Sequence, residues 1–437
     1  MLEHTQLQKA LGDVDLHLPA LELPRRNILY VVHRVPYPLD KGDRIRAFHL
    51  LRYLSHQADV HLACLADEPV PAETLTVLRR YCHRLAVVPL GPVRWMRAMV
   101  SLLRGRTVSE GVFKAPALAA TILDWTHTTT FNASIASSSA VSPYLRLPEL
   151  QGVPAIVDLV DVDSQKWLDY ASAEGGWRSW LYRTEGRRLR ALEQPMPAWA
   201  RAVTLVSEAE AAIYRRFCSS GHVRAVVNGV DLHYFQPRQA TVEPACVFVG
   251  ALDYRPNVDA VCWFVKTVWP SVHRRIPGSK LWLVGRRPAA AVRELACHPG
   301  IEVVGPVADV RPWMARAAAV IAPLRIARGL QNKVLEAMAM GKAVIASPPA
   351  LAALRVRPGK HCLRAASAAA WIKGVTRLIR NDRLRGCLGS AGRRYVEEHH
   401  HWDRCLEPMG ELLGLPERSR TERGNEEDWT LERLDPA

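Results

Sequence analysis

Short apolar runs rich in β-branched residues alternate with longer segments of helical periodicity along most of the chain. This alternation predicts β-α-β units, in which helices join parallel strands. The runs are apolar nearly throughout rather than at every second position, which is typical of strands covered on both faces of a sheet. The predicted strands are residues 27–32, 59–65, 85–90, 134–137, 155–159, 203–206 and 225–227 in the first half, and 246–250, 280–285, 302–305, 320–323 and 343–346 in the second.

The periodicity breaks between residues 235 and 244, where Pro237 and Pro244 precede a new strand. We therefore predict an α/β protein with two doubly wound, parallel-sheet domains that face each other across a cleft. Such sheets bind ligands at the carboxyl ends of their strands. The expected segments are an N-terminal extension over residues 1–24, domains over residues 25–238 and 239–397, and a charged, disordered tail over residues 416–437.

Composition excludes several classes of protein. With 49% hydrophobic and 23% charged residues the chain is typical of globular proteins, and no apolar run is long enough to span a bilayer. The first 24 residues lack the basic start and apolar core of a secretory signal. The nine cysteines are scattered without a C-x-x-C pair, which indicates neither a metal site nor a disulfide framework. We expect a cytoplasmic protein.

The net charge of +15 favours an anionic partner: nucleic acid, anionic lipid or a sugar nucleotide. Nucleic acid ranks last because no recognition motif is present. Residues 94–106 and 177–190 place Arg beside Trp and Leu at helical spacing, which suits peripheral contact with anionic lipid at the inner face of the cytoplasmic membrane. A solvated helix face, with Arg stems covering the edge of the core, is an equal alternative.

Residues 328–344 carry the strongest chemical signal. Gly329 lies in a loop, Lys333 and Glu336 lie in the helix that follows, and the helix ends at Gly341 before a strand. Amide groups at a helix N-terminus attract phosphate, and Lys333 adds a positive charge. Glu336, three residues on, shares the face of Lys333. A cation for phosphates and a carboxylate for hydroxyls suit a nucleotide diphosphate; a surface Lys–Glu pair is the simpler alternative.

Two stretches of the first half also carry candidate groups. Lys41, Gly42 and Arg44 follow the first strand and open a helix, which favours an anion, although a helix-capping turn explains the neighbouring aspartates equally well. Asp161 and Asp163 form a D-x-D pattern that could hold a divalent cation. We favour a cleft-lining role for them, on the acceptor side, and expect no metal. Residues 399–401 are three consecutive histidines, which are poorly placed to share zinc and more typical of a helix-start surface.

Five segments together resemble a known family. Residues 328–344, 226–237 and 247–259 resemble the donor-binding half of retaining GT-B glycosyltransferases of family 4, the glycosyl transferases group 1. Residues 36–46 and 157–167 narrow the likeness to the sugar transferases associated with exosortase (PEP-CTERM) systems. The likeness covers residues 27–413, and its motifs are specific jointly rather than singly.

The resemblance implies a GT-B fold with two Rossmann-like domains and a crossover helix, over residues 398–415, that returns to the first domain. It implies that Glu336 holds the ribose and that Lys333 and helix amides hold the diphosphate. Family members often carry a Glu where this chain has Arg328, and an Arg where it has Ala251. Arg255, four residues after Ala251, could supply the missing positive charge. Arg328 and Arg255 are therefore candidates for binding the donor. The other implied donor residues are Gly250, Val307, Gly329, Asn332 and Leu335; those implied on the facing domain are Lys41, Gly42, Arg44, Asp161 and Asp163.

The function that this resemblance implies is transfer of a sugar from a nucleotide diphosphate to a hydroxyl acceptor. It further implies retention of configuration, no metal and no other cofactor, and a lipid-linked glycan of exopolysaccharide biosynthesis as acceptor. Two alternatives stay open. An epimerase of the same fold would convert the donor without an acceptor. A partner protein that binds nucleotide sugars without catalysis would be compatible with Arg328 in place of the family Glu.

Overall fold

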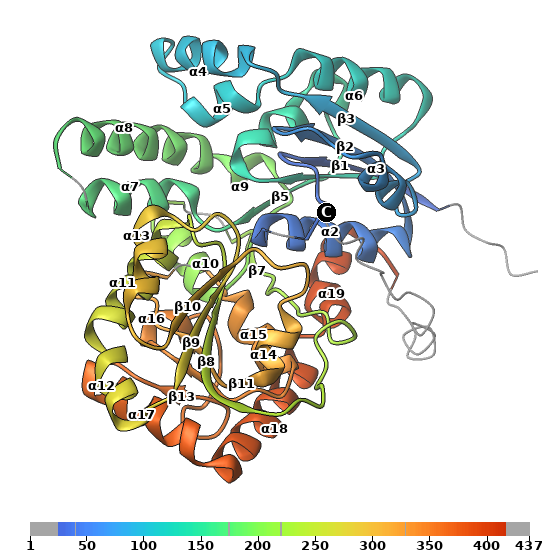
Figure 1. The fold of residues 1–437 in the computed structure, drawn as a ribbon. Coiled ribbons are helices and arrows are strands. Elements are labelled where there is room, and N and C mark those ends of the chain that lie inside the picture. The colour runs from blue at the N-terminus through green and yellow to red at the C-terminus, as the bar shows by residue number, and fades with distance from the viewer. Residues whose placement is uncertain (1–24, 40, 174, 219–220, 328, 417–437) are drawn as a thin grey trace, which may run out of the picture.

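The structure is a computed structural model that describes residues 25–39, 41–173, 175–218, 221–327 and 329–416. It contains two parallel β-sheets, each with helices on both faces, stacked one above the other with their carboxyl edges toward a shared interface (Figure 1). The prediction of two doubly wound α/β domains is therefore confirmed. The expectations for residues 1–24 and 417–437 lie outside the described residues.

The first sheet has the strand order β3-β2-β1-β4-β5-β6-β7. One face packs against α2, α3 and the C-terminal helix, and the other against α6, α9 and α10. Its strands are β1 (Arg26–Val32), β2 (Ala58–Ala66), β3 (Arg84–Pro89), β4 (Ala133–Ser137), β5 (Ala155–Val160), β6 (Ala202–Leu205) and β7 (Val223–Ala225). Its helices are α2 (Gly42–Ser55), α3 (Ala72–Arg79), α4 (Val93–Leu103), α5 (Val108–Phe113), α6 (Pro116–Thr128), α7 (Asp163–Ala173), α8 (Gly176–Glu193), α9 (Met196–Trp199) and α10 (Glu208–Arg215).

The second sheet has the order β10-β9-β8-β11-β12-β13. Helices α14, α15 and α18 cover one face, and α11, α12 and α17 the other. Its strands are β8 (Glu243–Val249), β9 (Lys280–Val284), β10 (Ile301–Gly305), β11 (Ala317–Ala322), β12 (Val344–Ala346) and β13 (Leu363–Arg364). Its helices are α11 (Arg255–Thr267), α12 (Trp269–Arg275), α13 (Ala290–Arg293), α14 (Arg311–Arg316), α15 (Asn332–Ala339), α16 (Pro348–Leu351), α17 (Ala368–Arg380) and α18 (Asp382–His399).

Each predicted strand overlaps an observed one. The run at residues 225–227 is shifted, because β7 lies at Val223–Ala225. Sequence analysis missed β13, whose two residues are at most half-buried and form no apolar run. The last strand of the first sheet ends at Ala225, and the first strand of the second sheet begins at Glu243. The exact domain boundaries stay a prediction.

The C-terminal helix α19 (Trp402–Leu413) leaves the second domain and packs on α2 of the first (Figure 1). Its residues Trp402, Leu406 and Met409 are buried in the core that α2 shares with β1 and β2. The amphipathic spacing of these side chains gives α19 one continuous apolar face, which the first domain buries. The helix thereby ties the two domains together, as the resemblance implied.

The three consecutive histidines lie where the chain turns from α18 into α19, so the expectation of a helix-start surface is wrong for His400. This ring is 4% exposed; its Nδ1 lies 2.9 Å from the carbonyl oxygen of Asn228 and its Nε2 lies 3.2 Å from the Tyr395 hydroxyl. The Val230 amide donates to the His400 carbonyl at 2.7 Å. His400 thus holds together the two chain segments that cross between the domains.

Candidate functional site

The N-terminus of α15 faces the N-terminus of α2 across the interface. A Cβ placed on Gly42 would lie 3.8 Å from Nδ2 of Asn332, and one placed on Gly329 would overlap Oδ1 of Asp161. Gly329 has a φ of 60°, a conformation that favours glycine. The structure therefore brings the Gly-bearing loop before α15 against both predicted stretches of the first domain, Lys41–Arg44 and Asp161.

Lys333 turns from the first turn of α15 toward the end of β8. Its Nζ donates a hydrogen bond to Asn257 Oδ1 at 2.7 Å and lies 4.5 Å from the centre of the Phe248 ring. Gly250 makes room for it, since a Cβ there would lie 3.1 Å from Nζ. Desolvation lowers the pKa of Lys333 to about 7, and Glu336 opposes this shift only in part. Lys333 therefore lies at the carboxyl edge of the second sheet, and its charge changes with pH near neutrality.

Glu336 lines a small interdomain cavity of about 10 Å³, room for about one water molecule. Asn332 and Leu335 line it from α15, and His49 and Trp402 line it from the first domain, where their rings stack at 4.4 Å. Two of the lining groups, Asn332 Oδ1 and Trp402 Nε1, are buried without a hydrogen-bond partner in the structure. The carboxylate of Glu336 therefore lies where α2, α15 and α19 meet.

The remaining predicted donor residues lie at strand ends of the second sheet. Arg255 is the first residue of α11 and is exposed, close to where β8 ends. Val307 follows β10 and packs against the core beneath α15. Arg328 lies outside the described residues. Sequence analysis missed Asn257, whose amide oxygen receives the Lys333 hydrogen bond; its place in the first turn of a helix after a strand was the available signal.

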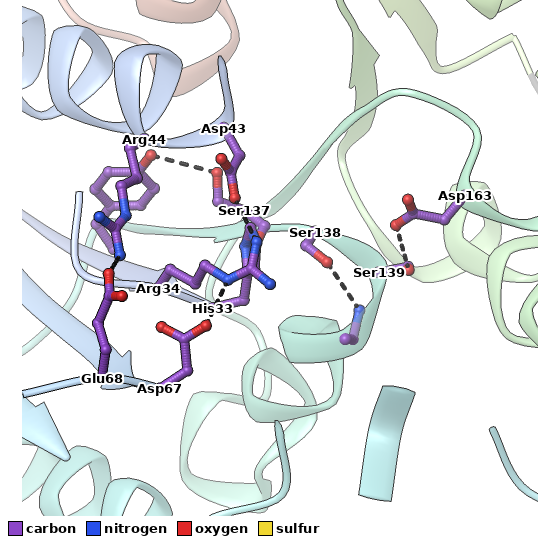
Figure 2. Close-up of polar contacts among 12 residues, drawn as sticks. His33, Arg34, Asp43, Arg44, Asp67, Glu68, Ser137, Ser138, Ser139 and Asp163 are labelled. Atoms are coloured by element: carbon purple, nitrogen blue, oxygen red, sulfur yellow. Dashed lines mark hydrogen bonds and ion pairs between the residues drawn. The ribbon is translucent and has the colours of Figure 1, made fainter. Parts of the chain in front are cut away.

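On the facing domain, an ionic network gathers where β1 and β2 end (Figure 2). Arg34 donates to Asp67 Oδ2 and to Asp43 Oδ2, each at 3.0 Å. Nε2 of His33 lies 3.2 Å from Asp43 Oδ2, and its Nδ1 lies 3.0 Å from the carbonyl oxygen of Ser137. Both ring nitrogens face acceptors, so His33 makes both hydrogen bonds only as an imidazolium.

Asp43 is the anion of this network. Burial by itself would raise the pKa of Asp43, but the hydrogen bond and charge of His33, together with Arg34, hold it well below its usual range. Sequence analysis missed His33, Arg34 and Asp67. The signal was their position directly after strands of a doubly wound sheet, which is where such sheets bind ligands.

A second group of carboxyls lies where β4 and β5 end. Asp163 Oδ2 accepts from Ser139 Oγ at 3.2 Å (Figure 2), and desolvation raises the pKa of Asp163. Nearby, desolvation and then the charge of Asp163 raise the pKa of Glu193 to about 8. The backbone at the ends of β4 and β5 is strained, since Ser138 and Val160 have φ angles of 94° and 66°. Strain of this kind at two adjacent strand ends is typical of a functional site.

Three predicted residues of the first domain have contacts of their own. Arg44 is 3% exposed and ion-paired with Glu68, while Lys41 caps α2 without a side-chain cap bond. A role for Arg44 toward an anion stays a prediction. Asp161 approaches Gly329, whereas Asp163 bonds to Ser139. Within the described ranges, no group of three or more His, Cys, Asp or Glu side chains is arranged to hold a metal ion.

Asp158 and Arg46, from the two first-domain segments that carry the family resemblance, form a buried ion pair. Arg46 donates from Nε and Nη2 to the two carboxylate oxygens of Asp158 at 2.7 and 2.8 Å, and both side chains are 0% exposed. Arg46 Nη1 also donates to Asn228 Oδ1 at 2.7 Å. Both oxygens of Asp158 are therefore occupied within the core, and Asp158 is not available to a ligand.

Residues 243–381 match the family model described as Glycosyl transferases group 1. No curated protein matches the chain. Among solved structures, sucrose-phosphate synthase from Thermosynechococcus elongatus superposes with a TM-score of 0.68 at 18% identity, covering 89% of this chain and 98% of that one. Anabaena HepE in complex with UDP and glucose gives a TM-score of 0.64 at 14% identity, covering 89% and 99%.

WaaG, a glycosyltransferase involved in lipopolysaccharide biosynthesis, gives a TM-score of 0.59 at 12% identity, covering 89% of this chain and all of that one. Because each covers 89% of this chain, these likenesses span both domains. The chain therefore has the GT-B fold, and the residues that match the Glycosyl transferases group 1 model lie in its second domain.

Proposed function

We propose that this protein is a glycosyltransferase that moves a sugar from a nucleotide diphosphate to a hydroxyl acceptor. The observation that carries the proposal is the meeting of α15 with the first domain. There a desolvated lysine, a helix N-terminus and a carboxylate lie on one side, and the strand-end network of His33 and Asp43 lies on the other. The match of residues 243–381 to Glycosyl transferases group 1, and the UDP and glucose in the complex with HepE, support the same activity.

The donor half of the proposed site follows from the chemistry of its groups. Lys333 and the first amides of α15 hold the diphosphate, and Glu336 accepts hydrogen bonds from the ribose hydroxyls. Gly250, Gly329 and the backbone near Val307 allow close approach of the nucleotide. Arg255, and Arg328 in place of the family Glu, bring positive charge to the donor. The cavity at Glu336 alone is too small for a ribose, so donor binding requires α2 and α15 to separate.

The mechanism that we propose retains the configuration of the sugar and needs no metal. The bond from the sugar carbon to the diphosphate breaks, the acceptor oxygen bonds to the same face, and its proton passes to the leaving diphosphate. Catalysis is then positioning plus stabilisation of the departing charge by Lys333, Arg255 and helix amides. Full activity in EDTA supports the metal-free mechanism, whereas loss that manganese restores contradicts it.

On the acceptor side, Asp161 and Asp163 line the cleft, beside the strained ends of β4 and β5. Asp163 has a raised pKa and is suited to a hydroxyl partner. We propose a lipid-linked glycan as acceptor, in exopolysaccharide biosynthesis of the exosortase-associated kind. This part of the proposal rests on the resemblance of residues 36–46 and 157–167.

The test is a thermal-shift panel of UDP, GDP, ADP and dTDP and their common sugars, on wild type and Glu336→Ala. A ligand at a hundred times its Kd adds about 2.7 kcal/mol of stability, enough to detect. We expect one base to stabilise the wild type and not the variant. No shift with any nucleotide contradicts the proposal. With the bound donor, product analysis then separates transfer from epimerisation and from binding without turnover.

A further inference from the structure

Most of the large apolar side chains that are exposed in the described part of the chain gather on α4 and α8. On α4, Trp95, Met96, Met99 and Leu103 are 62%, 63%, 65% and 81% exposed. Their spacings of one, three and four residues put them on one face of the helix. The opposite face packs through Ala98 and other small side chains, so α4 turns its large apolar residues toward solvent rather than toward the core.

Helix α8 continues this pattern at its N-terminal end. Trp177 and Trp180 are 71% and 66% exposed, one turn apart on the same face. Isolated exposed apolar residues are common, but an extended group of this size on a folded domain marks a surface that binds a partner. We call the exposed residues of α4 together with Trp177 and Trp180 the Trp–Arg surface, because of the charges described next.

The charged side chains of this surface have a single sign. Helix α4 contains no acidic residue, and the two acidic residues of α8, Glu185 and Glu193, are buried. Both are used internally: Glu185 accepts from the Val108 amide at 2.7 Å, and Glu193 accepts from the Ser164 amide at 3.1 Å. The arginines on and beside the two helices are Arg94, Arg97, Arg104, Arg106, Arg178, Arg183, Arg187, Arg188 and Arg190.

The two helices are fixed to each other. Arg188 of α8 donates from Nη1 to the carbonyl oxygens of Leu102 and Arg106 at 2.9 Å, just where α4 ends. Glu185 receives the first amides of α5, which itself packs on α4. Figure 1 shows α4 and α5 at the end of the first domain that is far from the second, with α8 between them and α7. The Trp–Arg surface is therefore a preformed feature of the first domain.

We propose that the Trp–Arg surface binds an anionic lipid bilayer, with its Trp, Met and Leu side chains among the upper acyl chains and its arginines on lipid phosphates. Tryptophan and arginine both suit the boundary between apolar and wet layers, and a one-sign basic face attracts anionic headgroups. A second copy of the chain would bring arginines against arginines. No helix in the described part of the chain is long and apolar enough to cross a bilayer, so the contact is peripheral.

Bilayer binding itself does not depend on the proposed function. Only its purpose, which is to bring a lipid-linked acceptor to the cleft, rests on the proposed function. The test therefore needs neither donor nor acceptor. The full chain is floated with vesicles of phosphatidylcholine, alone or mixed in equal parts with phosphatidylglycerol. We expect binding to the anionic vesicles only, and its loss in about 1 M salt, where the screening length falls to about 3 Å.

Variants separate the apolar contribution from the charges. Trp95→Ser/Met99→Ser/Leu103→Ser should weaken binding at least about tenfold, because three inserted side chains are lost. Trp177→Ser/Trp180→Ser should weaken it as well, and the two sets combined should weaken it further if both helices face one bilayer. Arg104→Gln/Arg106→Gln should weaken binding more than Arg383→Gln/Arg394→Gln, a control that removes the same charge from exposed sites on α18.

Each variant is also checked by thermal unfolding and by nucleotide binding, which the substitutions should leave unchanged because they lie on an exposed face. If the wild-type protein does not bind anionic vesicles, the inference is overturned. It is also overturned by binding that the apolar variants leave intact, or by a dimer that the Trp95 variant dissociates while neither form binds vesicles. Failure of vesicle binding with intact nucleotide binding leaves the proposed transferase standing, so the two proposals fail separately.

Discussion

Lys333 shows how one residue can be prepared for a charged ligand by its surroundings. Burial removes its ammonium group from water, where it contacts the Phe248 ring and donates to the Asn257 amide, and the absence of a Cβ on Gly250 lets the side chain reach them. The pKa of Lys333 falls to about 7 from its ordinary 10.5, so the group is largely neutral above pH 7. A bound diphosphate would favour the charged form and draw a proton onto it.

We therefore expect nucleotide-sugar affinity to fall as the pH rises from 7 to 9, by up to about tenfold per pH unit, because binding then requires proton uptake. Calorimetric titration in buffers of different ionisation enthalpy measures both the affinity and the proton uptake. Lys333→Met should bind more weakly and lose the pH dependence. Equal wild-type affinity from pH 7 to 9 would contradict this role.

The same pKa has a consequence for stability. Between pH 7 and 10.5 the unfolded chain carries a proton on Lys333 that the folded chain lacks. The free energy of unfolding should therefore rise with pH through this window as far as Lys333 contributes, and a bound donor that keeps Lys333 protonated should remove that rise. Stability rises with pH here because folding lowers the pKa of a basic group, so the unfolded chain binds the extra proton.

At the scale of elements, the buried pair of Arg46 and Asp158 joins α2 to β5. Thr204 of β6 adds a hydrogen bond to Asp158 Oδ1 at 2.7 Å, and Arg46 Nη1 reaches the carbonyl of Val226 at 2.9 Å in the linker beyond β7. All these groups are within the core, so removing one partner leaves a charge with no solvent to stabilise it. The pair fixes the position of α2, whose first turn carries Gly42 and Asp43.

Arg46→Leu should lower the free energy of unfolding by about 3–5 kcal/mol, because Asp158 remains buried without its cation. Urea unfolding of wild type and variant measures the difference. Arg383→Leu, on an exposed turn of α18, is the control and should change it by less than about 0.5 kcal/mol. Replacing both members, in Arg46→Met/Asp158→Leu, should recover part of the loss. A cost below about 1 kcal/mol for Arg46→Leu would show that the pair is dispensable.

At the scale of the molecule, two chain segments cross between the domains at one place. The linker through Asn228 and Gly229 passes the turn from α18 to α19, where a Cβ on Gly229 would lie 2.6 Å from the backbone of Trp402. Backbone cannot move aside as a flexible side chain can. Gly229 is therefore needed for the close approach that lets α19 return to the first domain and carry Trp402 to the cavity beside Glu336.

Gly229→Ala should destabilise the protein by about 1–3 kcal/mol through this overlap, and should also weaken donor binding because Trp402 shifts. Gly386→Ala is the matched control: it adds the same methyl group inside α18, where nothing lies within 4 Å. The control should raise stability by about 0.5–1 kcal/mol, since alanine is the better helix former. Thermal unfolding measures both. A Gly229→Ala protein as stable as wild type would contradict the steric argument.

Particular elements show why the fold was predictable. Strands such as β1 and β11 are buried on both faces and therefore read as continuous apolar runs, and this local signal is enough to predict two parallel sheets. Strand β13 was not predicted because it pairs with β12 through only two residues, which are at most half-buried. Its position therefore depends on its neighbour rather than on its own composition.

The candidate site divides in the same way. Lys333 and Glu336 lie three residues apart in one helix, so the sequence by itself determined that they share a face. The sequence also placed the polar groups of the first domain at strand ends, because strand ends follow from the apolar runs. These are local relations, fixed by the period of a helix or a strand.

Only the tertiary structure decided which polar groups are paired with one another. Asp158 lies within β5 and Asp163 follows that strand, yet Asp158 is paired with Arg46 and Asp163 accepts a hydrogen bond from Ser139. His33 and Asp43 meet because β1 and α2 return to the same edge, and His400 holds a linker far away in the chain. Burial and pairing depend on residues distant in sequence, and no local pattern encodes which partners the folded chain brings together.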